Sequence, residues 1–388
     1  MKWAPRLLVV LAVVAAITIA AVRDPVYWKR FVIALSHGGG ELPLSFYEPR
    51  QRVAGGNVPP APRVAPELES LDPRPLNEAA RYAEGFGTHA LIVTRHGHIV
   101  FEEYWSGTKF DTLEASEGFS RTLTAVLTGI AISDRKIGWP DEPIGNFIPE
   151  WSNDPRGKIT VRNLLQMSSG LAAATPDARF TTDVLKATLK TRLAGKPGET
   201  WADQAADPQL LALVIERATK EKFADYLSEA LWRRLGAADA WLWLDREGGT
   251  PHADCCMLVR QGDWIRVGEL LATNGRYQGD EIVAPGWIPQ MLLPAKGNAN
   301  YGSYLRLGAT QSAAEPYAAP DAFLVSSGGY RLWVVPSMQL VILRTGPALV
   351  GAGWDDSRIP NLIIRGARDF TPGQALPGSQ LEVLVPNH

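Results

Sequence analysis

Residues 117–137 read EGFSRTLTAVLTGIAISDRKI, and this stretch decides the fold. From Leu123 onward, apolar residues recur at the spacing of a helix face, and a charged segment ends the run. The pattern predicts a buried helix that begins near residue 118. Gly118, Ser120 and Arg121 lie in its first turn, so the chemistry open to these residues bears directly on function.

The composition is that of a globular protein without a nucleic-acid partner. The chain has 388 residues, of which 46% are hydrophobic and 21% charged, and its formal net charge is −2. A nearly neutral chain lacks the basic surface that binds phosphate backbones. No pattern in the sequence indicates a cofactor.

The two cysteines of the chain, Cys255 and Cys256, are adjacent. Neighbouring cysteines rarely reach disulfide geometry, and two are too few for a structural zinc site, which usually has four ligands. We therefore expect two unbonded, buried side chains and no metal site.

The N-terminus has the pattern of an export segment. Residues 1–22 read MKWAPRLLVVLAVVAAITIAAV, with Lys2 and Arg6 ahead of an uncharged apolar run from Leu7 to Val22. The run is either a cleaved signal or an uncleaved membrane anchor. The anchor is slightly favoured, although basic residues after the run weaken the charge asymmetry. Both alternatives place the body of the protein in a bacterial-type periplasm or cell envelope, secreted or anchored in the inner membrane.

The rest of the chain divides into three parts. Residues 23–74 are rich in proline, which predicts a stiff, extended linker. Residues 75–372 form the body, and residues 373–388 form a C-terminal tail. Within the body, about 150–290 read mostly as helices, which predicts an inserted helical domain.

The strands are expected on either side of that helical block. In 88–104, two apolar segments flank a turn at His96 and Gly97, which predicts a hairpin. Further strands are expected at about 301–309 and 322–345. The order predicts an α/β (α+β) fold, with the hairpin and the late strands in one antiparallel sheet flanked by helices, and with the helix from about 118 packed against that sheet.

Seven phrases of the sequence occur in the order found in one large enzyme family. They are LTGIAISDRKI, FIPEW, ITVRNLLQMSSGL, PGETW, QLLALVIERATKEKFADYLSEALWRRLGA, the CC pair before DWIRVGELLATNGRYQGDEIVAPGWI, and SGGYRLWVVPSMQLVILRTG. Together they run from about residue 80 to 369. This order resembles the class C β-lactamase and penicillin-binding-like serine hydrolases, in particular their aminohexanoate-dimer hydrolase branch. The resemblance implies a β-lactamase/transpeptidase-like fold.

The resemblance also implies a catalytic Ser-x-x-Lys motif at the start of the helix. One helical turn separates the two residues, so the lysine amine takes the proton of the serine hydroxyl. Here Gly118 stands at the serine position and Arg121 at the lysine position. Glycine offers no nucleophile, and arginine keeps its proton in proteins.

Two further catalytic positions of the family are also changed. The tyrosine that follows the PGETW phrase is replaced by Asp203, and the lysine or histidine before the GGY turn is replaced by Ser327. We expect Gly118, Arg121, Asp203 and Ser327 to meet in one cleft. One expectation is that Arg121, Asp203 and Ser327 pair there and serve as binding residues rather than catalysts. The alternative for Asp203 is a solvated carboxylate on a loop.

Other residues are candidates around the same cleft. Ser120 is the fallback nucleophile, but it points about 200° around the helix from position 118 and has no lysine on the next turn. Its alternative role is a first-turn or capping hydroxyl. His252, Tyr301 and Tyr330 are expected to contribute to binding.

The leading hypothesis is an exported, membrane-tethered pseudoenzyme that binds a small-molecule or peptide-like ligand, or a partner, in the former cleft. The alternative is an active serine hydrolase that cleaves an amide or ester bond with rebuilt catalytic residues. A third possibility is drift without any retained ligand. A cleft hydroxyl with a base within hydrogen-bond reach would favour the active hydrolase.

Overall fold

The computed structural model describes residues 24–38, 40–173, 180–349 and 353–370. The expected export segment, residues 1–22, and the expected tail, residues 373–388, lie outside these ranges. In the part of the chain that is described, no helix has the length and apolar character needed to cross a bilayer.

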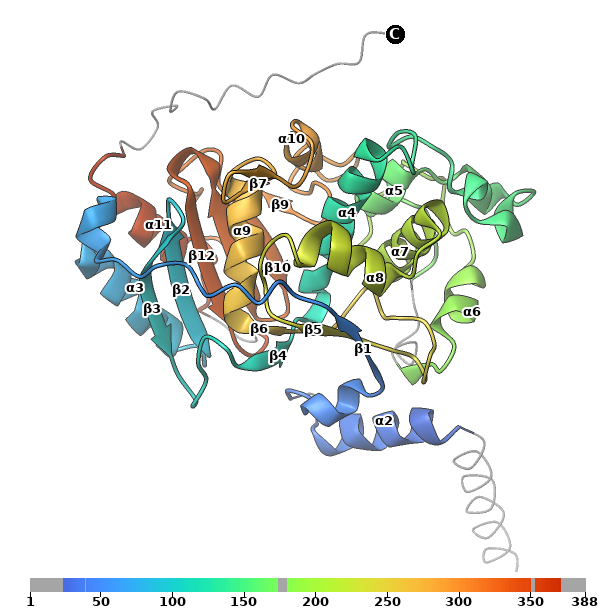
Figure 1. The fold of residues 1–388 in the computed structure, drawn as a ribbon, viewed down its shortest axis with the longest axis horizontal. Helices are drawn as coiled ribbons and strands as arrows, with labels where there is room; N and C mark the ends of the chain where they lie inside the picture. Colours follow the sequence, from blue (N-terminus) through green and yellow to red (C-terminus); the bar gives the residue numbers. More distant parts are fainter. Residues whose placement is uncertain (1–23, 39, 174–179, 350–352, 371–388) are drawn as a thin grey trace, which may run out of the picture.

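The main sheet has six antiparallel strands in the order β3-β2-β12-β11-β10-β9 (Figure 1). Strand β2 pairs with both β3 and β12, so the predicted hairpin lies in the same sheet as the late strands. The predicted antiparallel sheet is therefore confirmed. Its strands are β2 Ala90–Arg95, β3 His98–Tyr104, β9 Arg306–Leu307, β10 Phe323–Ser327, β11 Tyr330–Val335 and β12 Leu340–Thr345.

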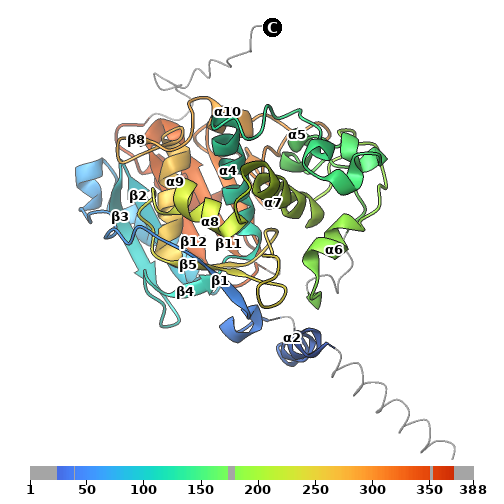
Figure 2. The same ribbon diagram turned by 45° about the vertical axis from the view of Figure 1, so that its right-hand side comes forward.

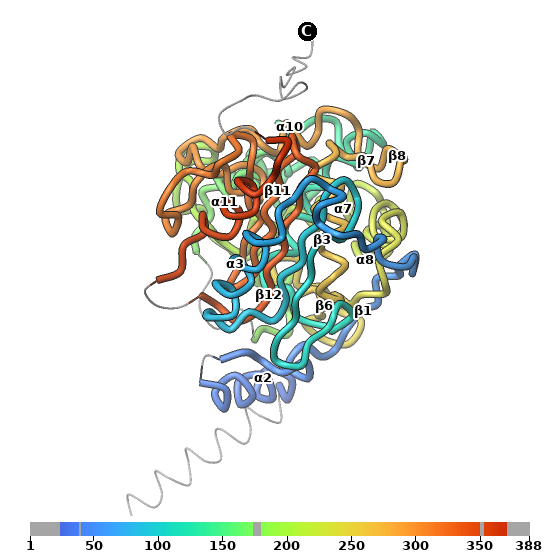
Figure 3. Tube along the Cα trace, turned by 90° about the vertical axis from the view of Figure 1, so that its left-hand side faces the viewer, coloured from blue at the N-terminus to red at the C-terminus, as the bar shows by residue number. Residues whose placement is uncertain are grey.

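Helices cover both faces of this sheet. Helix α9 (Trp264–Ala272) packs on one face against β11 and β12. Gly268 permits this close approach, because a Cβ there would collide with Val341. Helices α3 (Pro73–Glu84) and α11 (Arg358–Arg365) pack together on the other face, where Figure 3 shows them in front of the strands.

The stretch that opens the sequence analysis forms a short 3-10 turn, η3 (Glu117–Ser120), and helix α4 (Arg121–Ser133). The prediction that this helix packs one stripe against the sheet is only partly right. Turn η3 contacts β10, but α4 packs mainly against α7 (Ala206–Thr219), and every residue from Thr122 to Ala131 is buried. A helix that is apolar on all sides belongs inside the protein, and α9 takes the place on the sheet.

The block at about 150–290 is less uniformly helical than predicted. Its helices are α5 Val161–Leu165, α6 Val184–Leu189, α7, α8 Phe223–Leu227, α9 and α10 Trp287–Met291. A second, four-stranded sheet in the order β1-β5-β6-β4 draws two of its strands from this block. Its strands are β1 Arg50–Val53, β4 Leu113–Ala115, β5 Ala240–Trp243 and β6 Met257–Arg260, and a small hairpin adds β7 Arg276–Tyr277 and β8 Asp280–Glu281.

The predicted proline-rich linker is part of the folded body instead. Strand β1 pairs with β5, from Arg50 opposite Trp243 to Val53 opposite Ala240. Beyond β1, the buried guanidinium of Arg266 donates hydrogen bonds of 2.7 and 2.9 Å to the carbonyls of Val58 and Pro59. Proline removes backbone donors but leaves carbonyls free, and a distant arginine binds those carbonyls here.

Helix α2 (Pro25–Ser36) is attached to the body by Arg30, which is 1% exposed. Its guanidinium donates to the carbonyls of Glu48 at 3.0 Å, Thr181 at 3.3 Å and Leu244 at 2.6 Å, and it lies 4.7 Å from the centre of the Trp243 ring. Figure 2 shows α2 nearly end-on below β1. The helix is therefore docked at a fixed place.

We expect Arg30→Ala to release α2. Three carbonyls would lose their shared donor, and the buried Leu244 carbonyl alone would cost about 1–3 kcal/mol if left unsatisfied. Backbone amides of residues 26–36 should then exchange hydrogen at least about tenfold faster, which mass spectrometry measures. The matched control is Lys29→Ala, an exposed neighbour on the same helix. Unchanged exchange in Arg30→Ala would show that Arg30 does not hold the helix.

Candidate functional site

The candidate site is a cavity of about 560 Å³ beside the edge of the main sheet. It lies among the start of α4, residues 201–203 and 298–300 of the helical side, strand β9, and the turn between β10 and β11. Its charged lining consists of three arginines and two aspartates, Arg121, Arg306, Arg331, Asp203 and Asp356. Serines 326 and 327 add hydroxyl groups.

The four positions that the resemblance marked as catalytic meet at this cavity. The Gly118 N–H donates to Ser327 Oγ at 2.9 Å. Arg121 Nη1 donates to Asp203 Oδ1 at 2.7 Å, and Arg121 Nε donates to the Asp254 carbonyl at 2.8 Å. The predicted pairing of arginine with aspartate is present, whereas Ser327 bonds to the Gly118 backbone.

The place of a nucleophile at residue 118 is already occupied. A Cβ built on Gly118 would lie 2.9 Å from Ser327 Oγ and 3.0 Å from Arg121 Nε. The Gly118 N–H, which at a helix start would face a developing oxyanion, is engaged by Ser327. The turn is therefore closed by neighbouring side chains on the side where a serine would stand.

Arg121 remains a cation in this setting. Burial acts to lower the pKa of Arg121, but Asp203, Asp254 and Tyr301 act to raise it, and the pKa ends above its ordinary value. A permanently protonated guanidinium accepts no proton from a hydroxyl.

Tyr301 lies behind the cavity wall. Its ring packs edge-on to Trp201 with 5.1 Å between ring centres, and the Arg306 guanidinium lies 5.7 Å from the ring centre. Burial, and then the nearby Asp203 carboxylate, raise the pKa of Tyr301, so its phenol stays protonated. Tyr301 thus shapes the wall and positions Arg306.

Three expected site residues point elsewhere. His252 stacks on Trp243 at 3.8 Å, and burial lowers its pKa to about 3, with the Arg30 cation adding to the shift. Tyr330 donates to Glu114 at 2.6 Å, away from the ligand cavity. Ser120 Oγ is buried and has no hydrogen-bond partner in the described part of the chain, so no base activates it. The tertiary structure buries each of these three side chains, and the local sequence does not reveal this burial.

A sequence profile of the beta-lactamase family matches residues 77–308. The chain belongs to the beta-lactamase family. The match covers more than half of the chain, and it includes the start of α4, Asp203 and the whole block at about 150–290. The resemblance that the seven phrases indicated is thereby confirmed.

Two relatives of this beta-lactamase-family protein are similar in sequence. The 6-aminohexanoate-dimer hydrolase of Paenarthrobacter ureafaciens is 25% identical over 246 residues, which cover 58% of this chain and 62% of that protein. The “Putative D-alanyl-D-alanine carboxypeptidase” of Escherichia coli (strain K12) is 24% identical over 221 residues, which cover 47% and 51%. The chain thus spans less than two thirds of the length of either relative.

A solved structure supports the fold. The “Putative 6-aminohexanoate-dimer hydrolase from Bacillus anthracis” superposes with a TM-score of 0.70 at 18% identity, and the match covers 84% of this chain and 92% of that one. Identity this low shows the fold alone. It confirms the β-lactamase/transpeptidase-like architecture of the family member described here.

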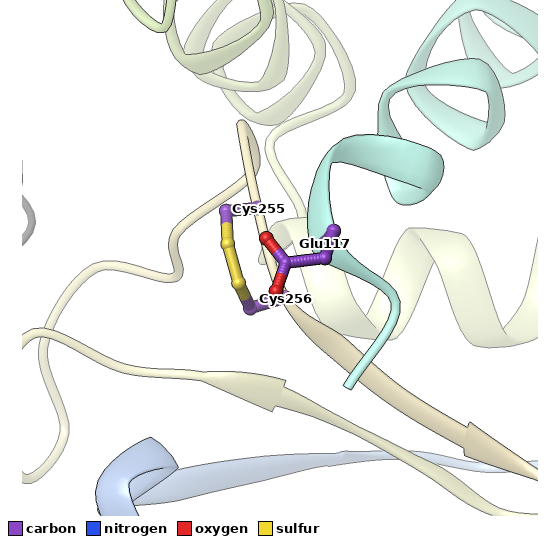
Figure 4. Close-up of side chains that lie close together, drawn as sticks. All are labelled: Glu117, Cys255 and Cys256. Atoms are coloured by element: carbon purple, nitrogen blue, oxygen red, sulfur yellow. A yellow bond between two sulfur atoms is a disulfide. The ribbon is translucent and has the colours of Figure 1, made fainter. Parts of the chain in front are cut away.

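The adjacent cysteines of this beta-lactamase-family chain are joined in a disulfide, contrary to the expectation of two free thiols. Cys256 has a φ of 72°, and this left-handed conformation accompanies a turn of the chain between the two side chains. Figure 4 shows the Glu117 carboxylate beside both sulfur atoms. Because the two sulfurs are bonded to each other, we assign no metal to this cluster.

Sequence reasoning missed two polar features near the cleft. Arg306 has no carboxylate within ion-pair distance among the described residues, and Ser326 Oγ accepts a hydrogen bond from its Nε at 3.3 Å. Asp207 lies fully buried on the first turn of α7, where Gln204 donates to it at 2.9 Å. The only sequence signal for Asp207 is its place four residues after Asp203.

We expect Asp207→Asn to change how stability depends on pH. Burial raises the pKa of Asp207 to about 8, against hydrogen bonds from Ser169 and Gln204, from an ordinary value of 3.8. Between these values the native state holds a proton that the unfolded chain has lost. The contribution of protonated Asp207 to the unfolding free energy is therefore fully present below pH 3.8 and is lost as the pH rises toward 8.

The asparagine side chain does not titrate, so the variant does not lose this stability as the pH rises. Its unfolding free energy, relative to the unmodified chain, should rise by up to about 1.4 kcal/mol per pH unit between pH 5 and 8, as measured by urea titration. Asp280→Asn, at an exposed site, is the control. A difference that stays constant with pH would show that Asp207 is ionised in the native protein.

Proposed function

We propose that this protein is an exported, membrane-tethered member of the beta-lactamase family that binds a ligand in the former catalytic cleft without acyl transfer. The observation that carries the proposal is the 2.7 Å ion pair between Arg121 and Asp203, at the positions that the resemblance assigns to the catalytic lysine and tyrosine. The apolar run from Leu7 to Val22 supports the tether.

Acyl transfer by serine needs a hydroxyl with a base beside it. In the described lining of the cleft, Ser327 Oγ accepts from Gly118 and Ser326 Oγ accepts from Arg306. Thr310 donates to Asp356 at 2.7 Å. Burial acts to raise the pKa of Asp356, but Arg331 and three hydrogen bonds lower it below its ordinary value, so it is a poor base. These contacts favour binding over the rebuilt-hydrolase alternative.

The charges of the cleft favour an anionic ligand. Asp203 neutralises Arg121, and Asp356 neutralises Arg331 through a contact of 2.7 Å. Arg306 is left without a carboxylate among the described residues, beside the Ser326 hydroxyl. A short amide with a terminal carboxylate fits this pattern, because guanidinium groups bind carboxylates strongly. Both sequence relatives are named for molecules of this kind.

The absence of acyl transfer is tested with a labelled fluorophosphonate and with nitrophenyl esters. We expect the unmodified chain to show no labelled serine and no hydrolysis above buffer, because no cleft hydroxyl has a competent base. The 6-aminohexanoate-dimer hydrolase of Paenarthrobacter ureafaciens is the positive control. A covalent adduct that Ser120→Ala abolishes would overturn the proposal in favour of an active hydrolase.

Restoring the serine and the lysine of the Ser-x-x-Lys motif tests whether residues 118 and 121 are the ancestral catalytic positions. Gly118→Ser alone should stay inactive, because Arg121 remains protonated and the new Cβ meets Ser327. Gly118→Ser with Arg121→Lys should form a slow acyl adduct, visible by mass spectrometry, since lysine loses its proton more readily when buried.

Ligand binding is tested by calorimetry with two probes, the linear dimer of 6-aminohexanoate and D-alanyl-D-alanine. We expect Arg306→Ala to weaken binding of the better probe about tenfold, because one charge-assisted hydrogen bond is lost. Arg276→Ala, at an exposed site outside the cleft, should leave binding unchanged. Equal binding by both variants, or no binding of either probe, would contradict the carboxylate site.

A further inference from the structure

Helix α2 has one face on the body and one face in solvent. Tyr27 and Ala34 pack with the aromatic cluster around Trp243, on the same side as the buried Arg30. On the opposite side, Val32 is 58% exposed and Leu35 is 70% exposed. An apolar helix face that is open to water normally has a partner.

Three exposed residues and the half-buried Trp28 form one stripe. At 100° per residue, Trp28, Phe31, Val32 and Leu35 fall within an arc of about 100°. Phe31 is 37% exposed and lies at the edge of the stripe, because its ring packs edge-on both to Trp28, with 5.6 Å between ring centres, and to Phe180 of the body, with 5.9 Å. Lys29 stands at the border of the stripe. Aromatic and aliphatic residues with a flanking lysine are typical of helices that lie in the membrane–water interface.

The direction of this stripe is fixed by contacts at the start and in the middle of the helix. Asp24 caps the helix by accepting from the Tyr27 N–H at 3.0 Å, and it also accepts from Thr182 at 2.8 Å. Farther along, Arg30 bonds to three carbonyls of the body. Figures 1 and 2 show α2 at one extremity of the described part of the chain.

We propose that α2 lies flat in the membrane–water interface, with Val32 and Leu35 toward lipid and with Trp28 and Phe31 beside them. The inference rests on the proposed membrane tether. The apolar run ends at Val22, and two residues span at most about 7 Å, so a tethered run holds the start of α2 at the membrane surface. Because α2 is docked rigidly, it also sets the orientation of the body on the bilayer.

Helix α2 also lies beside a second cavity that adjoins the ligand cleft. The segment after α2 walls this cavity of about 460 Å³ through Gly40 and Leu44. The same cavity reaches Gly328, a residue that also lines the ligand cleft. The turn between β10 and β11 therefore lies between the cavity beside α2 and the ligand cleft.

The test uses the full chain in vesicles of phosphatidylcholine and phosphatidylglycerol. A photo-crosslinking phenylalanine analogue replaces one residue at a time, at Leu11 in the apolar run, at Leu35 on the stripe, or at Leu68. Leu68 is the matched control, because it is 76% exposed and lies on the turn before α3, apart from α2. We expect lipid adducts at Leu35 to exceed those at Leu68 about tenfold by mass spectrometry.

Each outcome decides between the tether and the flat helix. Adducts at both Leu11 and Leu35 support the inference, and adducts at Leu35 alone support it without the tether. Adducts at Leu11 but not Leu35 overturn the flat helix and leave the tether standing. No lipid adduct at either site overturns both, and crosslinks from Leu35 to a second copy of the chain show that the stripe is a protein interface instead. None of these outcomes depends on ligand binding in the cleft.

Discussion

The complete burial of helix α4 is the constraint on which the site depends. Helix α4 packs against α7 and α10, and the η3 turn that precedes it contacts β10. These contacts hold the start of the helix in place relative to both halves of the body. Trp287 donates to the Ala125 carbonyl at 3.1 Å, and Gly129 leaves the space that its indole fills. A turn held this firmly brings residues from distant parts of the chain to the same few atoms each time the protein folds.

The first turn of α4 is also where the two halves of the body are joined electrostatically. Arg121 extends from α4 to Asp203 on the helical side and to the Asp254 carbonyl before β6, while the Gly118 backbone bonds to Ser327 at the end of β10. An ancestral mechanism would need these groups free to exchange protons. In this protein they are bound to each other, so they hold the helical side to the sheet side, and under the proposed function the neighbouring Arg306 supplies the binding group.

The sequence predicted the sheet, the family and the meeting of Gly118, Arg121, Asp203 and Ser327, because ordered family phrases carry long-range information. It did not predict the fold of residues 24–74, where Arg30 and Arg266 bind carbonyls that local composition cannot reveal. It misplaced His252 and Tyr330, since only the tertiary structure shows which side of the chain they face. Arg306 was missed because the sequence does not show that it has no carboxylate within ion-pair distance among the described residues. Asp207 was missed because the sequence does not show that it is buried.

The pairing of β1 with β5 has a practical consequence for recombinant work on this protein. A fragment that starts at residue 75, where the sequence alone would set the boundary, lacks β1 and leaves the edge of β5 that faces β1 unpaired. An open strand edge invites pairing between molecules, so such a fragment is prone to aggregate. Insolubility of the shortened protein would then reflect a missing strand, and a fragment that begins before Arg50 keeps that edge covered.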